Sequence, residues 1–173
     1  MEEVIRINTP ITREAAASLH VGDRVLISGK IYCGRDAVLP KVQAAIDDGT
    51  AKELGIEPEG AVIFHTAVSP AGVGPTSSNK LEIESSIKPL SEAGVRMHLG
   101  KGALKQETVA ALAENGAVYA VIPPVTALLG AKTKSQRLVA FPELGMEALY
   151  ELEVEDYPAI IGAAHGESIY DKR

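Results

Sequence analysis

Residues 74–80, with the sequence GPTSSNK, combine a turn-forming Gly-Pro pair with hydroxyl groups, an amide and a cation. The pair favours a tight turn, and the apolar pattern that follows predicts a helix beginning near Lys80. A turn that leads into a helix N-terminus presents free backbone N–H groups to an anion. Thr76 and Ser77 add hydroxyl donors there. Taken alone, the segment is more typical of a helix N-cap, so the anion-binding interpretation depends on two further segments.

Those two segments place a cation in a short loop. Arg35 follows a predicted strand and opens a predicted helix, where its guanidinium can grip a carboxylate with two parallel hydrogen bonds. Lys101 stands between two glycines, which let a ligand approach the backbone closely. Each cation, considered by itself, is more typical of a surface ion pair or a solvated lysine. Together with Thr76 and Lys80, however, they suit a small dicarboxylate that needs a cation at each end.

The elements that must position these residues alternate along the chain. Alternating apolar residues predict strands, and apolar residues with helical spacing predict helices between them. The predicted strands are residues 4–8, 24–32, 61–68, 95–99, 117–122, 137–141 and 148–154. The predicted helices are residues 12–19, 35–46 with Pro40 as a complication, about 80–93, 104–114 and 125–131. This order predicts an α/β fold in a single domain spanning residues 1–173, with a mixed central sheet.

Composition limits the class of protein. The chain has 173 residues, of which 46% are hydrophobic, enough for one domain with a real core. Aromatic residues make up only 4%, so aliphatic side chains must build that core. A net charge of −6 argues against a nucleic-acid-binding protein. It remains compatible with a small anionic ligand in a locally positive pocket.

Cys33 is the single cysteine, so the chain cannot form an internal disulfide. We expect Cys33 to be a small buried hydrophobic residue, because no second thiol or metal-ligand spacing accompanies it. The histidines also lack such spacing, and His65, within a β-rich run, is interpreted as a core or rim residue. We therefore expect no metal site in this chain. The N-terminus lacks the apolar core of a signal peptide, and no apolar run is long enough to span a bilayer, so we expect a cytoplasmic protein without membrane contact.

Five segments follow one another along the chain: GDRVLISGKIYCGRDA, GPTSSNKLE, HLGKGAL, AVYAVIPPVTALLG and LGMEALYELEVEDYPAIIG. In this order they resemble segments of a known family, the class I fumarate hydratases and the tartrate dehydratase β subunit. The resemblance extends from about Thr9 to Tyr170. It implies a swivelling β/β/α domain of an iron–sulfur hydro-lyase that adds or removes water across a C4 dicarboxylate.

The resemblance also implies roles for individual residues. Thr76 matches the catalytic threonine of the family's GPTT segment, Arg35 the arginine of its RD motif, and Lys101 the lysine of its GKG motif. Three positions depart from the pattern: Ser77 replaces a threonine, Lys80 replaces an arginine, and Leu39 replaces a histidine. We expect Arg35, Ser77, Lys80 and Lys101 to bind substrate.

In that family a separate α subunit, or an N-terminal domain, carries a 4Fe–4S cluster. A cluster of this kind needs about three or four thiolates, and this chain has one. We therefore expect the cluster on a partner α subunit in a hetero-oligomer, with a homodimer as an option for the isolated chain. The expected reaction is fumarate to malate first and tartrate to oxaloacetate next.

Two alternatives stay open at this point. The chain could be a non-catalytic module that binds dicarboxylates or regulates a partner, because a fold does not determine a function. It could also be a phosphohistidine carrier, although residues 74–80 contain no histidine. Neither the choice of substrate nor the number of subunits follows from the sequence.

Overall fold

The computed structural model describes residues 4–34, 38–69, 72–76, 80–100, 104–122 and 133–168. Within these ranges, residues 66–85 and 146–147 are described by their backbone alone. The strands are β1 Val4–Asn8, β2 Arg24–Cys33, β3 Val62–Phe64, β4 Thr66–Ser69, β5 Gly72–Thr76, β6 Met97–Gly100, β7 Val118–Val121, β8 Thr133–Ala140, β9 Leu149–Ala164 and β10 Glu167–Ser168. The helices are α1 Arg13–Ala17, α2 Leu39–Asp48, α3 Lys80–Glu92 and α4 Gln106–Glu114, with 3-10 helices η1 Lys52–Leu54 and η2 Pro142–Glu147.

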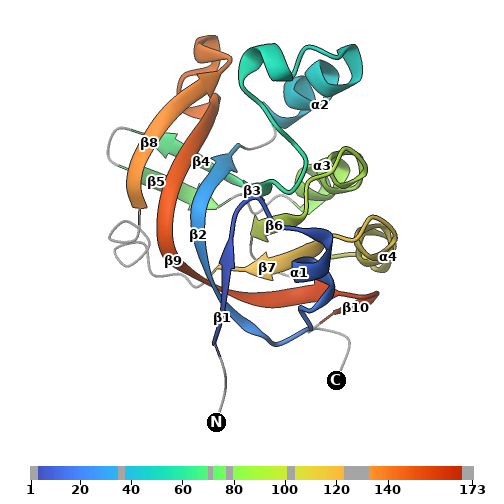
Figure 1. Cartoon of the computed structure of the whole chain (residues 1–173). Helices are drawn as coiled ribbons and strands as arrows, with labels where there is room; N and C mark the ends of the chain where they lie inside the picture. The colour runs from blue at the N-terminus through green and yellow to red at the C-terminus, as the bar shows by residue number, and fades with distance from the viewer. Residues whose placement is uncertain are drawn as a thin grey trace.

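Five strands close into a ring (Figure 1). Strands β2, β3, β6 and β7 run parallel to one another in that order. The long strand β9 then pairs antiparallel with β7 along one part and with β2 along another, so it joins the two ends of the parallel set. Strands β1, β8 and β10 extend this sheet at its margins, and β4 and β5 form a separate hairpin. The mixed sheet of the predicted α/β fold is therefore confirmed.

A bulge lets β2 and β9 curve enough to close the ring. Their register shifts between Ile27 and Gly29, and Asp156 on the opposite strand has a φ of 54°. The Asp156 N–H donates a hydrogen bond to Ser28 Oγ at 3.0 Å, so this backbone group has a partner although the strand pairing is interrupted here. Gly29 has a φ of 114°, and a Cβ there would lie 2.4 Å from Thr9 Oγ1. Glycine is therefore required at this point of the strand.

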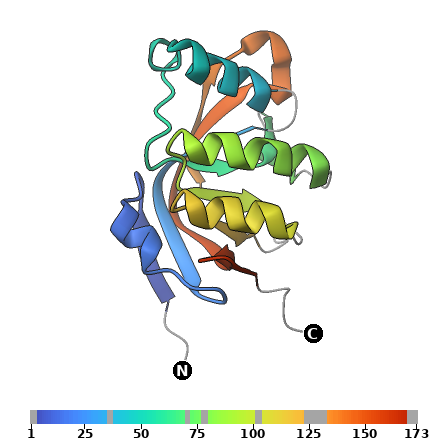
Figure 2. The same ribbon diagram turned by 90° about the vertical axis from the view of Figure 1, so that its right-hand side faces the viewer.

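The ring encloses the main hydrophobic core. Its inward residues come from every strand of the ring and include Ile27, Cys33, Phe64, Leu99 and Leu152, all nearly inaccessible to solvent. Helices α2, α3 and α4 lie side by side on one outer face of the ring (Figure 2). Two smaller apolar clusters fill the space beneath them, one around α2 and one between α3, α4 and β7. The core is mainly aliphatic, as the low aromatic content predicted, although Phe64, Tyr119 and Tyr157 are also fully buried.

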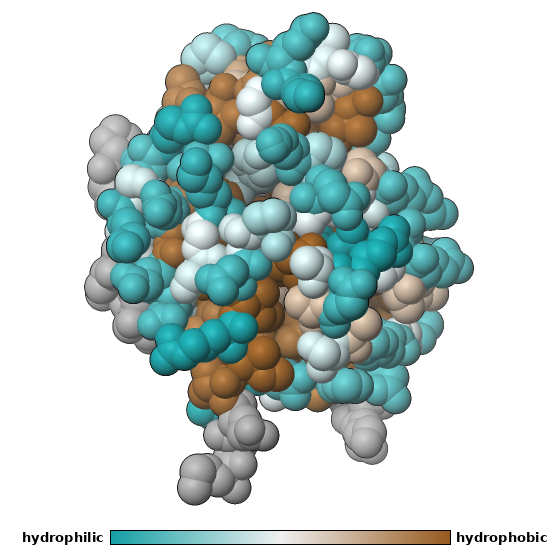
Figure 3. All heavy atoms as spheres, in the orientation of Figure 1, coloured by the Kyte–Doolittle hydropathy of each residue, from teal (hydrophilic) through white to brown (hydrophobic). Residues whose placement is uncertain are grey.

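The surface is mixed, with polar side chains over most of the face seen in Figure 3. Apolar side chains gather on its lower part, near the N-terminus. The large exposed apolar residues of the described chain include Val4, Leu138 and Ile160. No helix in the described ranges combines the length and apolar character needed to cross a bilayer.

Several predicted boundaries need correction. Helix α2 begins at Leu39 and carries Pro40 in its first turn, where a missing N–H is tolerated; residues 35–37 of that predicted helix lie outside the described residues. The predicted loop at residues 69–79 contains strand β5. The predicted strand at residues 148–154 is only the first half of β9. The predicted helix at residues 125–131 lies outside the described residues.

Candidate functional site

The carboxyl ends of the parallel strands β2, β3 and β6 are aligned at one edge of the ring, which we call the carboxyl edge. Cys33 of β2 pairs with Phe64 of β3, and Phe64 pairs with Leu99 of β6. The next backbone bonds continue the row, because Gly34 N–H donates to Phe64 O at 3.0 Å and His65 N–H donates to Leu99 O at 3.1 Å. Neighbouring strands lie about 4.8 Å apart, so Gly34 and Gly100 are separated by about 10 Å. In α/β sheets this edge is the usual place for a ligand.

The hairpin of β4 and β5 brings a fourth segment to the same edge. Strand β4 begins at Thr66, directly after His65, and Thr66 is the register partner of Thr76. The backbone of Thr76 therefore lies beside the end of β3 rather than at the far tip of the hairpin. Helix α3 begins at Lys80, four residues later, and four residues span at most about 14 Å. The amino end of α3 must therefore start close to this edge.

The predicted site residues can now be placed as far as the structure describes them. Thr76 is the last residue of β5 and Lys80 the first residue of α3, and the structure describes only the backbone of both. Arg35, Ser77 and Lys101 lie outside the described residues. Gly34, Thr76 and Gly100, the described residues immediately before them, all stand at the carboxyl edge. The arrangement of the five side chains remains a prediction.

Beneath this edge lies a polar chain that the sequence did not indicate. His65 and His98 are 1% and 0% exposed, and His65 Nε2 lies 3.2 Å from His98 Nδ1. The two rings are stacked, with centroids 5.4 Å apart. His98 Nε2 lies 3.0 Å from the hydroxyl oxygen of Ser91, which is itself buried. The residues are too far apart in sequence, and on too many elements, for spacing to reveal this contact.

Burial keeps both imidazoles neutral. It lowers the pKa of His65 from 6.5 to about 4. Burial also lowers the pKa of His98 well below its usual value, with a further contribution from His65 beside it. A neutral imidazole has one donor and one acceptor nitrogen, which is what a chain of three hydrogen-bonding groups requires. His65 Nδ1 has no hydrogen-bond partner among the described residues.

Cys33 is a core residue, as the sequence predicted. It is 1% exposed, and burial raises the pKa of its thiol, so a reactive thiolate is disfavoured. In the described part of the chain, no three His, Cys, Asp or Glu side chains come together in a way that could hold a metal ion. An iron–sulfur cluster does not fit this set of residues, because the single thiol is enclosed in the core.

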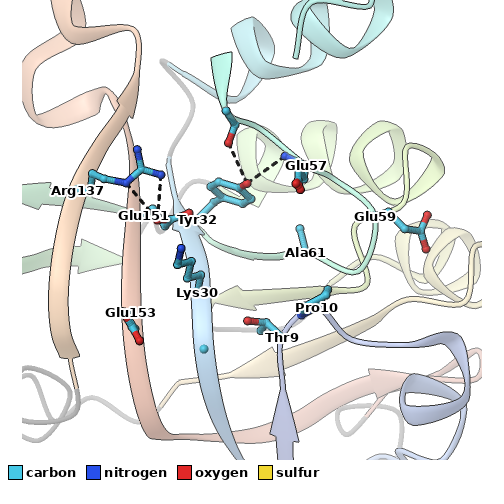
Figure 4. A pocket seen from close by; sticks show the side chains of 12 residues that line it. Thr9, Pro10, Lys30, Tyr32, Glu57, Glu59, Ala61, Arg137, Glu151 and Glu153 are labelled. Atoms are coloured by element: carbon cyan, nitrogen blue, oxygen red, sulfur yellow. Dashed lines mark hydrogen bonds and ion pairs between the residues drawn. The ribbon is translucent and has the colours of Figure 1, made fainter. Parts of the chain in front are cut away.

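A cavity of about 540 Å³ opens elsewhere, on the outer side of β2 and β9 (Figure 4). Tyr32 anchors one wall: its hydroxyl accepts from Glu57 N–H at 3.0 Å and donates to Gly55 O at 3.3 Å. The charged side chains of the lining are Glu57, Glu59, Glu151 and Glu153, against Lys30 and Arg137. Arg137 is already paired with Glu151 at 3.1 Å. Because carboxylates outnumber cations, this cavity repels a dicarboxylate, and the carboxyl edge remains the better candidate.

The comparisons with known proteins agree on one family. The model of a family described as "Fumarase C-terminus" matches residues 1–173. The chain is 31% identical over 167 residues to "Fumarate hydratase class I, anaerobic" of Escherichia coli (strain K12), covering 91% of this chain and 30% of the relative. It is 28% identical over 168 residues to "Fumarate hydratase 2" of Leishmania major, covering 92% of this chain and 29% of the relative.

A third relative is similar in length to this chain. The "Putative L(+)-tartrate dehydratase subunit beta" of Methanocaldococcus jannaschii is 31% identical over 177 residues, covering 94% of this chain and 89% of the relative. By contrast, the chain spans about 30% of the length of the two fumarate hydratases. The similar region is thus one part of some relatives and nearly all of another.

Proposed function

Because the chain belongs to the Fumarase C-terminus family, we propose that it is the β part of a hydro-lyase acting on a C4 dicarboxylate. Reversible hydration of fumarate to malate is the first candidate reaction, and dehydration of tartrate to oxaloacetate is the second. The relatives whose names carry these activities support the reaction class. The relative named as a β subunit, of which the chain covers 89%, supports a chain that works with a separate α subunit.

The observation that carries the proposal is the alignment at the carboxyl edge. Gly34, Thr76 and Gly100 reach this edge from three different elements, and Lys80 begins α3 four residues after Thr76. Gly34 and Gly100 directly precede Arg35 and Lys101, whose cationic side chains can bind a carboxylate. Thr76 and Lys80 are themselves candidate site residues. A substrate of this kind has two carboxylates at a fixed separation, so it needs cations from opposite sides rather than from one loop. The edge supports such an arrangement.

The proposed roles follow from the chemistry of each side chain. Arg35 and Lys80 neutralise the substrate carboxylates, and Ser77 donates a hydrogen bond to one of them. Thr76 moves the proton at the carbon next to a carboxylate. A threonine hydroxyl is a weak base at its ordinary pKa, so it needs a cation beside it, and we assign that role to Lys101. The same cations stabilise the charge that spreads onto the carboxylate when the proton leaves.

The partner follows from what this chain lacks. We propose that an α subunit holds a 4Fe–4S cluster, because Cys33 is the single cysteine of the chain and is enclosed in its core. The full site would then form where the carboxyl edge meets that subunit. A phosphohistidine carrier is less well supported. His65 and His98 are buried, and the exposed His20 and His165 lie against each other near the amino end of β2, away from the carboxyl edge.

Anaerobic co-production with the cluster-bearing subunit tests the proposal. The purified complex is expected to hydrate fumarate or to dehydrate tartrate, and the isolated chain to do neither. Fumarate, malate, both tartrate enantiomers and a methyl-substituted C4 acid form a suitable panel. A chain that binds malate but forms no complex with any cluster protein would support the alternative of a non-catalytic dicarboxylate-binding module. A complex inactive on the whole panel would contradict the proposed substrate class.

A further inference from the structure

We infer that His65, His98 and Ser91 form a positioning device for the proposed site, a buried hydrogen-bonded chain that holds three site-bearing elements in one arrangement. The inference rests on the proposed function, because it concerns how residues of that site are held. None of the three is assigned a contact with substrate. Their role is to fix the base of the β4–β5 hairpin, the end of β6 and the last turn of α3 relative to one another.

Each member of the chain belongs to an element that leads to a different candidate residue. His65 joins β3 to β4 and directly precedes Thr66, the register partner of Thr76. His98 lies in β6, two residues before Gly100, which precedes Lys101. Ser91 lies in the last turn of α3, the helix that opens at Lys80. The contacts among His65, His98 and Ser91 therefore connect the three elements that carry or precede Thr76, Lys80 and Lys101.

The direction of the side chains places this link between the ring and the helices. Met97 and Leu99 of β6 belong to the core inside the ring, so His98 between them points outward, as strand alternation requires. Phe64 also belongs to the inner core, which puts His65 on the outer side. Ser91 meets His98 from α3, which covers that outer face (Figure 2). The link thus spans the joint between the two layers.

Packing alone does not account for polar groups at this position. Most of the neighbouring side chains are apolar: Ile63 and the ring of Tyr119 belong to the register partners of His98, and Ile87 and Leu90 are buried on the same helix as Ser91. Apolar side chains of similar volume would fill this space without desolvating three polar groups. Hydrogen bonds, unlike apolar contacts, have a required distance and direction. A buried chain of them therefore favours one relative placement of hairpin, strand and helix over neighbouring ones.

The proton positions follow from the contacts. One arrangement has Ser91 donating to His98 Nε2 and His98 Nδ1 donating to His65 Nε2, which leaves the proton of His65 on Nδ1. The other has His65 Nε2 donating to His98 Nδ1 and His98 Nε2 donating to Ser91, which leaves His65 Nδ1 bare. Both arrangements keep each imidazole neutral with one proton. In both, the contact between His65 and His98 holds a single proton, so the two rings act as one unit.

Two variants at His65 and one at Ser91 test this role. His65→Leu removes the link to His98, whereas His65→Gln keeps an amide near the position of Nε2 and is expected to retain part of the function. Ser91→Ala removes the far end without touching the hairpin. Val25→Ala is the matched control: Val25 is equally buried, but it lies in the core inside the ring at the amino end of β2, away from the carboxyl edge.

The first readout needs no enzyme activity. Backbone hydrogen exchange of the isolated chain is expected to rise about tenfold for residues 72–76 in His65→Leu, and to rise less in His65→Gln. In Val25→Ala, exchange in the hairpin should match the wild-type chain. Unchanged exchange at residues 72–76 in both His65→Leu and Ser91→Ala would overturn the inference. So would a uniform rise across all strands, which would indicate a role in stability alone.

The second readout uses the complex with the α subunit. His65→Leu and Ser91→Ala are expected to lower kcat by about tenfold or more with a smaller change in KM, because misplacement of a reacting group affects the chemical step most. His65→Gln should recover much of the loss, and Val25→Ala should keep the wild-type kcat. Wild-type kcat in all variants would overturn the inference. If even the wild-type complex is inactive, the proposed function fails, while the exchange data still decide whether the link positions the hairpin.

Discussion

Thr66 and Thr76 are register partners at the base of the β4–β5 hairpin, and Thr66 directly follows His65 at the end of β3. This relationship brings Thr76 back to the edge of the ring, although Thr76 lies ten positions after Thr66 in the sequence. It also makes the placement of Thr76 depend on how β3 ends. The carboxyl edge, the contact between His65 and His98 and the packing of the ring can each be tested by substitution.

The first prediction concerns the stability of the fold in acid. In the unfolded chain His65 titrates near its ordinary pKa of 6.5, whereas in the folded chain its pKa is about 4. Below pH 6.5 the unfolded state therefore binds a proton that the folded state does not bind. The free energy of unfolding is therefore not reduced above pH 6.5. It falls as the pH drops toward about 4, by about 1.4 kcal/mol per pH unit for each such histidine. His98 shifts in the same direction and adds to the effect.

Urea unfolding at pH 7.5, 6 and 5 measures this loss. His65→Gln is expected to be less stable than the wild-type chain at pH 7.5 but to lose less stability on acidification. The free energies of unfolding of the two proteins should therefore converge toward pH 5. Parallel pH dependences for the two proteins would mean that His65 is not the group that titrates on unfolding.

The second prediction concerns Arg96, whose side chain is 1% exposed at the start of β6. One guanidinium nitrogen lies 2.5 Å from Glu59 Oε2, and the other donates to Asn115 O at 3.1 Å. Glu59→Ala leaves the buried guanidinium without a carboxylate. Because the Glu59 side chain is 74% exposed, solvent reduces the effect, and we expect a loss of about 1–3 kcal/mol.

Glu155→Ala is the matched control for Glu59→Ala. Glu155 pairs with Lys134 at 3.5 Å, and both side chains are more than half exposed. Such pairs contribute about 0–1 kcal/mol. Urea unfolding at pH 7.5 should therefore separate the two variants clearly, and equal losses would contradict the structural role of Arg96.

The third prediction concerns the close packing at Gly100, the last residue of β6. A Cβ at Gly100 would lie 3.2 Å from Tyr119 Oη and 3.3 Å from Tyr119 Cε1. Gly100→Ala must therefore shift the ring or the end of β6, with a loss of stability of about 1–3 kcal/mol. Because Lys101 follows directly, kcat/KM of the complex should fall by about tenfold or more.

Gly162→Ala on β9 provides the comparison for Gly100→Ala. Its Cβ would crowd Val121 Cγ2 at 3.0 Å and the same tyrosine ring at 3.3 Å, but no candidate site residue adjoins it. Thermal unfolding should show losses of similar size for the two variants, with the loss of activity confined to Gly100→Ala. Equal losses of kcat/KM in the two variants would show that displacement of the Tyr119 ring causes the loss, rather than a shift of the backbone next to Lys101.

The fourth prediction concerns Cys33. Because the thiol is buried and its pKa is raised by burial, it should resist alkylation by iodoacetamide at pH 8 until urea unfolds the chain. Cys33→Ala removes one buried sulfur and should cost about 1 kcal/mol in stability. The complex should keep its iron content and its kcat. Loss of iron in a folded Cys33→Ala complex would place a cluster ligand in this chain and refute the assignment of the cluster to the partner.

Much of the fold was predictable because its strands have clear local patterns. The alternation of Val25, Ile27 and Ile31 against polar neighbours predicted β2 almost to its ends. Asn115 and Gly116 correctly marked the end of α4, where the Asn115 side chain donates to Ala111 O. Pro40 obscured the start of α2, since a proline in the first turn and one in mid-helix look alike before the boundary is known.

The errors arose where tertiary pairing overrides local signals. Gly72, Gly74 and Pro75 are typical of a loop, yet pairing with β4 makes this segment a strand. Asp156 and Pro158 resemble a strand end, but pairing with β2 carries β9 through both residues. The contact between His65 and His98 depends on the register of β3 and β6, and a single sequence does not reveal which strands become neighbours. The candidate site residues, by contrast, come from the composition of three segments and from the resemblance, and the placement of their side chains stays a prediction.

In the proposed function, the carboxyl edge, with Thr76 at the end of β5, carries the proton-transfer part of a dicarboxylate site that a cluster-bearing partner completes. Steady-state kinetics of the Thr76→Ala and Thr76→Ser complexes test it most directly, at matched iron content and under anaerobic conditions. We expect kcat to fall by about 10²–10⁴-fold in Thr76→Ala, with KM changed only a few-fold, and Thr76→Ser to retain much of the activity. Wild-type kcat in a folded, cluster-loaded Thr76→Ala complex would contradict it.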